Sequence, residues 1–364
     1  MLLSLVFIAG GIALLIFGSD LLIRGAVTIA RTAGLSPLVI GLTVVAFGTS
    51  APEMAISTIS ALDGNADIAM GNVVGSNIFN VWMVLGLSAS IIPLRVANQI
   101  IRFDTPVTIG VSILALLFAL DLSIVRLESL ALCTGIIAYV GFLIKNGRSG
   151  MAESGKPEKA EKVPGKNAAL RTGIAALLFC AGLALLIAGS KIMVHGAVNI
   201  ATALGVSELI IGLTIVAAGT SMPELATSVV AAIRGERDIA VGNAIGSNIF
   251  NLLAVLGLSG LVSPEPMTVA PNMLFTDIPV MIGVILLCLP VFAARHTLNR
   301  MWGVLFVLFY AAYTAYLILS NQDTPGLTLI CRLGLFGAIG ISIIGAAVYA
   351  LAVRRKTHPL GTPY

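Results

Sequence analysis

Charge is scarce in this chain of 364 residues: only 10% are Asp, Glu, Lys or Arg, whereas 58% are hydrophobic. A soluble domain normally carries about 25% charged residues, so this composition excludes an ordinary soluble protein. Apolar runs of about 20 residues recur along the whole chain, and each is long enough to cross a bilayer core of roughly 30 Å. The mean hydropathy of +1.03 agrees. The sequence therefore predicts an all-α polytopic membrane protein.

Side chains for metal, nucleotide and redox chemistry are also few. The four cysteines lie in apolar segments, where a lone thiol packs as a small hydrophobe. The three histidines show no metal-ligand spacing. The phosphate-binding G-x-x-x-x-G-K-[ST] motif and the zinc motif H-E-x-x-H are both missing. We therefore expect no cofactor, no nucleotide and no enzyme activity, and the net charge of +4 gives no reason to expect a nucleic-acid partner.

The most informative feature that is present is an internal duplication. Gly41–Asn80 aligns without gaps on Gly212–Asn251 at a constant offset of 171, with 25 identities in 40 positions. The preceding segment Gly11–Ala30 aligns on residues 182–201 with 12 identities in 20. The motifs that are most similar between the two copies are polar and helix-breaking, namely G-T-S-x-P-E and G-S-N-I-F-N. A duplicated membrane domain with broken helices is typical of secondary transporters.

Eleven spans are predicted. The first five and the second five form the repeats (residues 1–145 and 169–320), joined by a polar, basic linker (146–168) that we expect to be flexible. Residues 327–353 form an eleventh span without a partner, followed by a short tail (354–364). The first span lacks the basic n-region of a signal peptide, so we expect it to be retained. The spans cover roughly residues 2–28, 36–61, 68–93, 103–121, 125–145, 169–196, 207–232, 239–263, 273–293, 300–320 and 327–353.

Five spans per repeat is an odd number, so the second copy must enter the membrane inverted. Excess Lys and Arg mark cytoplasmic loops. With the N-terminus outside, 18 of the 21 basic residues lie inside, and only Arg126, Lys191 and Arg332 lie outside. Asp63 aligns with Arg234, so equivalent loops carry opposite charge. We therefore predict insertion in the cell inner (plasma) membrane, with the N-terminus outside and the C-terminus cytoplasmic. The oligomeric state is left open, with a monomer as one option.

The first predicted cation ligands lie in the two G-T-S-x-P-E motifs. Pro52 removes a backbone donor and Gly48 adds freedom, so we expect the second span to unwind near Ala46–Ser50 and to free carbonyl oxygens. The seventh span should do the same at residues 217–221, before Pro223. A carboxylate inside a membrane is costly and marks function by default. Glu53 and Glu224 occupy the same position of the G-T-S-x-P-E motif in the two copies and are therefore the leading candidates for cation binding.

Spans 3 and 8 supply neutral oxygens. Ser76 and Asn80 are four residues apart and share one helix face, as do Ser247 and Asn251. The alternative is that these side chains only hold helices together, which we favour for Asn72 and Asn243. With two carboxylates, hydroxyls, amides and carbonyls, and no thiolate or imidazole, the ligand set favours Ca²⁺ and Na⁺ over Zn²⁺ or Cu⁺.

At these residues the chain resembles the cation/Ca²⁺ exchanger superfamily, and its Na⁺/Ca²⁺ branch most closely. The G-T-S-x-P-E and G-S-N-x-x-N words both occur twice, over a 5+5 arrangement that covers about residues 1–320. The resemblance implies Ca²⁺ held by Glu53, Glu224 and the carbonyls of Thr49 and Thr220. It implies Na⁺ bound on one side by Ala46, Thr49, Ser50, Ser76 and Glu224, and on the other by Ala217, Thr220, Ser221, Ser247 and Glu53.

The chain departs from relatives of that superfamily in three respects. Asn251 stands where potassium-dependent members carry Asp, so coupled K⁺ transport is not expected. The long Ca²⁺-sensing insert of animal exchangers is absent from the sequence. The eleventh span is additional to the usual ten.

The sequence leaves the coupling ion open. A secondary Na⁺/Ca²⁺ antiporter working by alternating access is the leading interpretation. A H⁺/Ca²⁺ antiporter is the alternative, because Glu53 and Glu224 could also carry protons. A cation channel is less favoured, since it needs one continuous path, whereas inverted repeats with broken helices favour alternating access.

Overall fold

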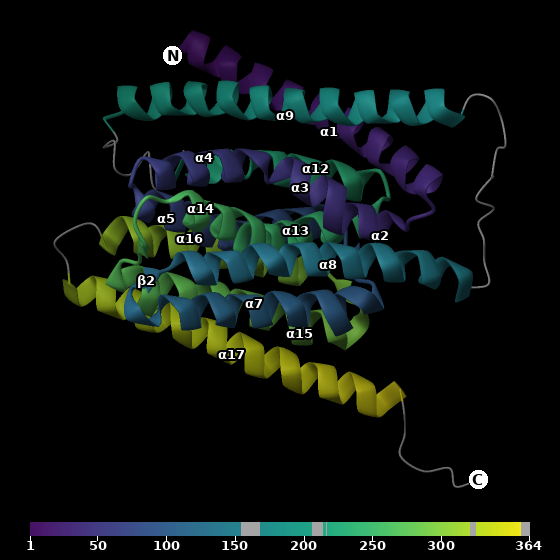
Figure 1. Cartoon of the computed structure of the whole chain (residues 1–364). Helices are drawn as coiled ribbons and strands as arrows, with labels where there is room; N and C mark the ends of the chain where they lie inside the picture. Colours follow the sequence, from purple (N-terminus) through teal and green to yellow (C-terminus); the bar gives the residue numbers. More distant parts are fainter. Residues whose placement is uncertain (154–167, 206–213, 216, 321–324, 358–364) are drawn as a thin grey trace, which may run out of the picture.

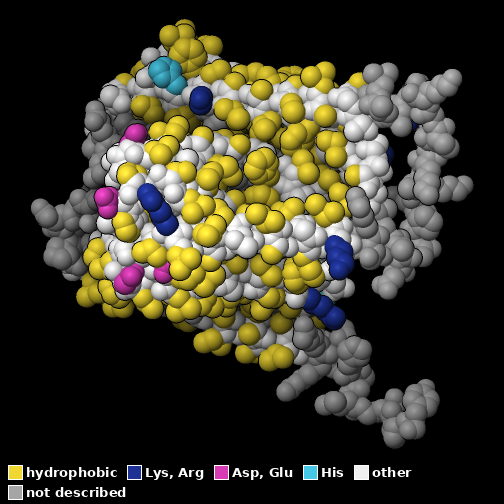
Figure 2. Space-filling model, in the orientation of Figure 1, with side chains coloured by type: hydrophobic (Ala, Val, Ile, Leu, Met, Phe, Trp, Pro, Cys, Tyr) yellow, Lys and Arg dark blue, Asp and Glu magenta, His cyan; other side chains and the backbone are white. Residues whose placement is uncertain are grey.

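The computed structural model describes residues 1–153, 168–205, 214–215, 217–320 and 325–357, and these residues are almost entirely helical. Nine of the described helices are long and apolar enough to cross a membrane, and a tenth candidate is a bent pair. Charged side chains on the visible face gather mainly toward its two ends, and the surface between them is largely apolar (Figure 2). This arrangement confirms the prediction of a polytopic helical membrane protein.

The elements follow the predicted spans. The first half contains α1 (Leu2–Ala33), α2 (Pro37–Ile40), η1 (Gly41–Val45), α3 (Ala46–Thr49), α4 (Ala51–Leu62), α5 (Ala66–Phe79), η2 (Asn80–Leu85), α6 (Gly86–Ile91), β1 (Leu94–Arg95), η3 (Ile100–Asp104), α7 (Thr105–Phe118), η4 (Ala119–Asp121), β2 (Ser123–Ile124) and α8 (Arg126–Glu153). The second half contains α9 (Ala168–Ala203), α11 (Ala217–Thr220), α12 (Met222–Ile233), α13 (Arg237–Phe250), η6 (Asn251–Val255), α14 (Leu256–Val262), β3 (Met267–Thr268), η7 (Met273–Asp277), α15 (Ile278–Arg295), β4 (Thr297–Leu298), α16 (Arg300–Ser320) and α17 (Pro325–Thr357).

The second span is broken, but less widely than predicted. Its two parts, Pro37–Thr49 and Ala51–Leu62, meet at an angle of 46°. Ala46–Thr49 stays helical and only Ser50 leaves the helix, because proline removes a single donor. The amide of Ser50 still donates to the carbonyl of Ala46 (3.0 Å). The expected unwinding over five residues was therefore wrong, and one serine marks the break.

The seventh span shows the same break where it is described. Helix α11 ends at Thr220, Ser221 has φ −90° and ψ 9°, and α12 starts at Met222 with Pro223 in its first turn. Proline is tolerated at that position because the amides of a first turn have no helical acceptor. The predicted start of this span, residues 206–213, lies outside the described residues.

The helices that contain the G-S-N-I-F-N motifs form the centre of the molecule. In the most apolar 18-residue window, 72% of α5–α6 and 78% of α13–α14 is buried, compared with 17% of α17. Both central spans widen into a π-helical turn at the same point, since η2 starts at Asn80 and η6 at Asn251. π-Helical turns inside α-helices often occur at functional sites.

Helices α1 and α9 cover one side of this core, and α17 lies on the opposite side (Figure 1). α1 and α9 are antiparallel, because Gly11 lies against Gly189 whereas Gly25 lies against Ala175. A Cβ atom on Gly25 would come within 2.6 Å of the Ala175 carbonyl oxygen. Only glycine permits such a close approach of two helix backbones in a membrane, so the two helices are held together along a seam of small residues.

Two short antiparallel strand pairs join loops of the first half to loops of the second. β1 pairs with β4, with Leu94 opposite Leu298. β2 pairs with β3, with Ser123 opposite Thr268. Each pairing fixes the ends of neighbouring spans and holds two connecting loops at the same face of the bundle.

The fifth span is longer than predicted. Helix α8 continues to Glu153, eight residues beyond the predicted end of the fifth span, because no proline interrupts the chain before Pro157. The predictions for residues 154–167 and for the tail from 358 onward fall outside the described residues.

Candidate cation site

Glu53 and Glu224 occupy equivalent places in the structure. Each lies in the first turn of a 12-residue helix that starts directly after the break, α4 for Glu53 and α12 for Glu224. The N-terminus of a helix favours a negative charge. Both side chains are nevertheless completely buried, with 0% exposure. The Pro-Glu dipeptide at each helix break thus places one carboxylate in the interior of the protein.

The two breaks face one another through reciprocal hydrogen bonds. Ser50 donates to Glu224 Oε1 (3.3 Å), and Ser221 donates to Glu53 Oε1 (2.9 Å). The serine of each break therefore contacts the glutamate of the other. The Ser221 hydroxyl also lies 3.0 Å from the hydroxyl of Ser76. The structure brings five of the predicted residues into one cluster through these contacts.

The threonines of the breaks reach the central helices in the same crossed manner. Thr49 donates to Asn243 Oδ1 (3.0 Å) and lies 3.5 Å from the hydroxyl of Ser247. Thr220 donates to Asn72 Oδ1 (3.3 Å). Thr49, Thr220 and Ser247 are thereby connected to the same central cluster.

Asn72 and Asn243 hold the glutamate helices in position. Asn72 Nδ2 donates to the Glu53 carbonyl (3.2 Å) and to Ser57 Oγ (2.9 Å). Asn243 Nδ2 donates to the Glu224 carbonyl (3.3 Å) and to Ser228 Oγ (3.0 Å). The predicted packing role is confirmed by these bonds. Their bonds to the opposite break were not predicted, although the identity of Asn72, Asn243, Ser57 and Ser228 between the two copies was a signal for them.

Several buried polar atoms of the predicted ligands have no hydrogen-bond partner within the described part of the chain. They are the second carboxylate oxygens of Glu53 and Glu224, and both side-chain polar atoms of Asn80 and Asn251. Leaving a buried acceptor unpaired costs free energy, and more so for a charged one. These oxygens are of the hard type that Ca²⁺ and Na⁺ prefer, so their chemistry fits a cation substrate.

The remaining predicted ligands lie at the ends of short elements. Ala46 is buried at the start of α3, next to Gly246 on α13. Its carbonyl was expected to be free, but it accepts bonds from the Ser50 amide and from Thr49 Oγ1 (3.4 Å). Ala217 is the first residue of α11. Among the described residues no hydrogen bond links Asn80 or Asn251 to the glutamates, and both are fully buried at the start of their π-helical turns.

Two further acids inside the spans were missed by the sequence analysis. Asp104 accepts a hydrogen bond from Tyr139 (3.0 Å), and Asp277 accepts one from Tyr313 (2.8 Å). They end the equivalent π-helical turns η3 and η7. The signal was an aspartate two residues before a proline in both copies, but these positions are 173 residues apart, outside the register of 171. Each acid has a tyrosine partner on another helix, which gives it a structural role.

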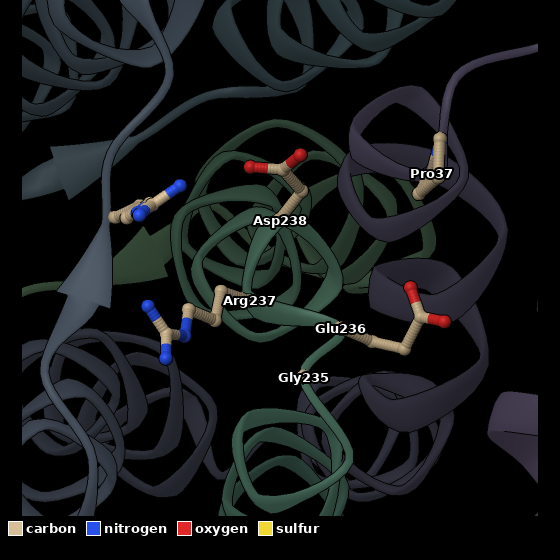
Figure 3. Close-up of a pocket in the computed structure, with 6 residues that line it drawn as sticks. Pro37, Gly235, Glu236, Arg237 and Asp238 are labelled. Carbon is tan, nitrogen blue, oxygen red and sulfur yellow. The ribbon is translucent and has the colours of Figure 1, made fainter. Parts of the chain in front are cut away.

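A cavity of about 410 Å³ lies away from this cluster, at the loop between α12 and α13 (Figure 3). None of the predicted ligands lines it. Its charged side chains are of both signs, with Glu236 and Asp238 opposed by two arginines, so they offer no net preference for a cation. It is lined by Pro37, Arg95, Gly235, Glu236, Arg237 and Asp238.

Comparison with known proteins shows which family the chain belongs to. Residues 3–145 and 174–319 match the family model described as sodium/calcium exchanger protein. The chain is 38% identical to the putative antiporter CaxA of Alkalimonas amylolytica, over 88% of this chain and 100% of the relative. It is 34% identical to the sodium/calcium exchanger MaX1 of Methanosarcina acetivorans, over 84% of this chain and 96% of the relative.

Solved structures give the same result. The chain resembles the sodium–calcium exchanger NCX_Mj, studied with Na⁺ and Sr²⁺, with a TM-score of 0.72 and 32% identity over 86% of this chain and 98% of that chain. The described helices therefore share the fold of NCX_Mj over most of this chain. The relatives are exchangers and antiporters, which are transporters and not enzymes.

Proposed function

We propose, because this chain belongs to the sodium/calcium exchanger protein family, that it is a secondary antiporter exchanging Na⁺ for Ca²⁺ by alternating access. The observation that carries the proposal is the crossed pair of buried glutamates. Each shares one carboxylate oxygen with the serine of the opposite break and has a second oxygen without a hydrogen-bond partner in the described part of the chain. A divalent cation between the two helix breaks would neutralise both charges.

Calcium is proposed to bind at Glu53 and Glu224, with the carbonyls of Thr49 and Thr220 as neutral ligands. Two carboxylates and several carbonyls on short, broken helices suit Ca²⁺, which accepts six to eight oxygens in flexible geometry. Mg²⁺ demands a tighter octahedron. The ligand set therefore favours Ca²⁺ as the divalent substrate.

Sodium is proposed to use the same acids together with hydroxyls and backbone oxygens on either side. The Ser221–Ser76 and Thr49–Ser247 contacts place a hydroxyl of a break beside a hydroxyl of a central helix in both halves. Asn80 and Asn251 add buried oxygens. The full set proposed for the two ions is Glu53, Glu224, Thr49, Thr220, Ser50, Ser221, Ser76, Ser247, Asn80, Asn251, Ala46 and Ala217.

The topology proposed for the chain is two inverted five-helix repeats, 1–145 and 169–320, with an eleventh span at 327–353. The antiparallel packing of α1 on α9 supports an inverted relation, since these helices open the two copies. The strand pairs support it too, because β1–β4 and β2–β3 each join loops that the inverted arrangement places on one side of the membrane. We place the protein in the cell inner (plasma) membrane, with the 146–168 linker and the tail in the cytoplasm.

Cysteine labelling of intact cells checks this orientation. In a variant without native cysteines, Gly155→Cys is expected to resist a membrane-impermeant maleimide until the cells are opened, because the basic linker lies inside. Asp121→Cys, on the exposed turn before β2, is the matched control and should react from outside. Labelling of Gly155→Cys in intact cells at the rate of Asp121→Cys would reverse the topology.

Uptake of ⁴⁵Ca²⁺ into proteoliposomes tests the coupling ion. Vesicles loaded with Na⁺ and diluted into Na⁺-free medium are expected to take up Ca²⁺, and a pH gradient of equal size without Na⁺ should drive little. The reason is that hydroxyl and carbonyl oxygens beside the glutamates provide ligands for Na⁺ that a proton does not need. Uptake driven by the pH gradient alone would establish the H⁺/Ca²⁺ alternative.

A further inference from the structure

One ion pair ties α1 to the end of α12. Asp20 on α1 pairs with Arg234, which caps the C-terminus of α12, and also with Arg24 one turn further along α1 (3.0 Å). The Asp20 side chain is only 18% exposed. The pair therefore connects the α1–α9 layer to the helix that carries Glu224.

The internal repeat supplies a second pair with both charges exchanged. At the offset of 171, Asp20 corresponds to Lys191 on α9, and Arg234 corresponds to Asp63, which caps the C-terminus of α4. The acid of the first pair thus corresponds to a base in the second, and the base to an acid, so the two residues of the second pair also have opposite charges. Among the described residues, the ion pairs do not include Lys191 or Asp63, and both are exposed.

The packing of the α1–α9 layer differs between the halves in the same sense. α1 packs along α12, and α9 packs on α11 and α12. The layer contacts the second span through α2, η1 and Gly48 of α3, whereas its contacts with α4 are at most marginal in the described part of the chain. Ser190 on α9 donates to the carbonyl of Gly219 in α11, whereas its counterpart Ser19 donates within α1, to Leu15 (2.7 Å). The layer is therefore seated on α12, the helix that carries Glu224, and not on the counterpart of that helix, α4.

We propose that Asp20–Arg234 and Lys191–Asp63 are alternative latches, formed in turn in the two opposite states of the transport cycle. This rests on the proposed alternating access, in which one bundle rocks against the other around a fixed site. In a protein with inverted repeats, the second state exchanges the roles of the two halves. The layer then sits on α4, so that Lys191 meets Asp63 while Asp20 and Arg234 separate.

The exchange of charges has a physical reason. An inverted copy with unchanged charges would carry an arginine at position 63, in a loop that faces outside in the proposed topology. Basic residues are disfavoured in outer loops. Placing the acid on the outer loop and the base on α9 keeps the latch attractive and preserves the charge bias that orients the chain.

Cross-linking in membranes tests the latch. In a background with the four native cysteines replaced, the first-latch pair (Asp20→Cys with Arg234→Cys) and the second-latch pair (Asp63→Cys with Lys191→Cys) are treated with a bifunctional methanethiosulfonate of salt-bridge length. Both pairs are expected to cross-link, and each cross-link should stop exchange until it is reduced. The matched control pair, Asp63→Cys with Arg24→Cys, should remain unlinked, because these residues lie at opposite faces.

The competition between latches is measured in the same assay. Asp20→Asn is expected to raise the rate of cross-linking of the second-latch pair by about two- to fivefold, the population shift expected from loss of a partly exposed ion pair. With native residues at the first latch, Lys191→Asp should slow exchange, and adding Asp63→Lys should restore it. A merely structural lysine would not be rescued in this way.

The latch is refuted if the second-latch pair reacts no faster than the control pair, with Na⁺, with Ca²⁺ and with neither, while the first-latch pair does cross-link. Absence of rescue by the charge exchange also refutes it. Failure of the proposed function is a separate result, because it appears as absence of Na⁺-driven Ca²⁺ uptake by the unmodified protein.

Discussion

Glu53→Gln is expected to lower Na⁺-driven Ca²⁺ uptake at least a hundredfold at subsaturating Ca²⁺, and Glu224→Gln is expected to do the same. Each glutamate provides half of the fixed negative charge at the crossed helix breaks. A divalent ion about 4 Å from a unit charge gains roughly 8 kcal/mol at an effective dielectric constant of 20. Losing a third of that value, about 2.7 kcal/mol, already corresponds to nearly hundredfold weaker binding.

The fold should survive these substitutions. Glutamine keeps a carbonyl oxygen that can accept the hydrogen bond from Ser221 or Ser50, and it removes a buried charge. The check combines uptake with thermal unfolding in detergent. Ca²⁺ should raise the melting temperature of the unmodified protein by mass action, and that rise should vanish in both variants.

Glu265→Gln makes the same chemical change on an exposed loop residue and should leave uptake and the Ca²⁺-dependent stabilisation unchanged. Normal Ca²⁺ uptake by a folded Glu53→Gln or Glu224→Gln protein would remove that glutamate from the proposed site.

The sequence predicted the spans well because the forces that define them are local. Apolar length sets a membrane helix, and its ends carry signals such as Gly34, whose φ of 65° closes α1, and Ser36, whose hydroxyl caps α2. The width of the break after Thr49 was wrong because it depends on which carbonyls find another donor. Proline identity alone does not give that information, and the Ser50 amide supplied the donor.

The candidate site was predictable as a list of residues but not as a network. The repeat identified Glu53, Glu224 and the serines, because identical polar motifs inside two apolar segments indicate a shared function. It did not show that each serine bonds to the glutamate of the other copy, since such contacts arise only from tertiary packing. Asp104 and Asp277 escaped because the loops before them differ by two residues, which breaks a constant-offset alignment.

Obligate exchange is the second large effect expected. Glu53 and Glu224 are fully buried, and in the described part of the chain neither forms an ion pair with a base. An unloaded carrier would have to occlude two bare carboxylates while it switches between faces. Effective burial penalties of several kcal/mol per ion would slow that step by orders of magnitude, at about 1.4 kcal/mol per tenfold in rate.

One Ca²⁺ cancels the two charges, and so do two Na⁺, so loaded carriers can switch. Ca²⁺ efflux from loaded vesicles is therefore expected to be slow in medium without Na⁺ and Ca²⁺, at clamped membrane potential, and to rise at least a hundredfold when Na⁺ is added outside. External Ca²⁺ alone should also restore the flux of tracer, because it lets the carrier return loaded. Fast efflux into ion-free medium, at the rate seen in Na⁺, would identify a uniporter or channel, because only a channel, or a carrier that can return empty, releases Ca²⁺ continuously without a counter-ion.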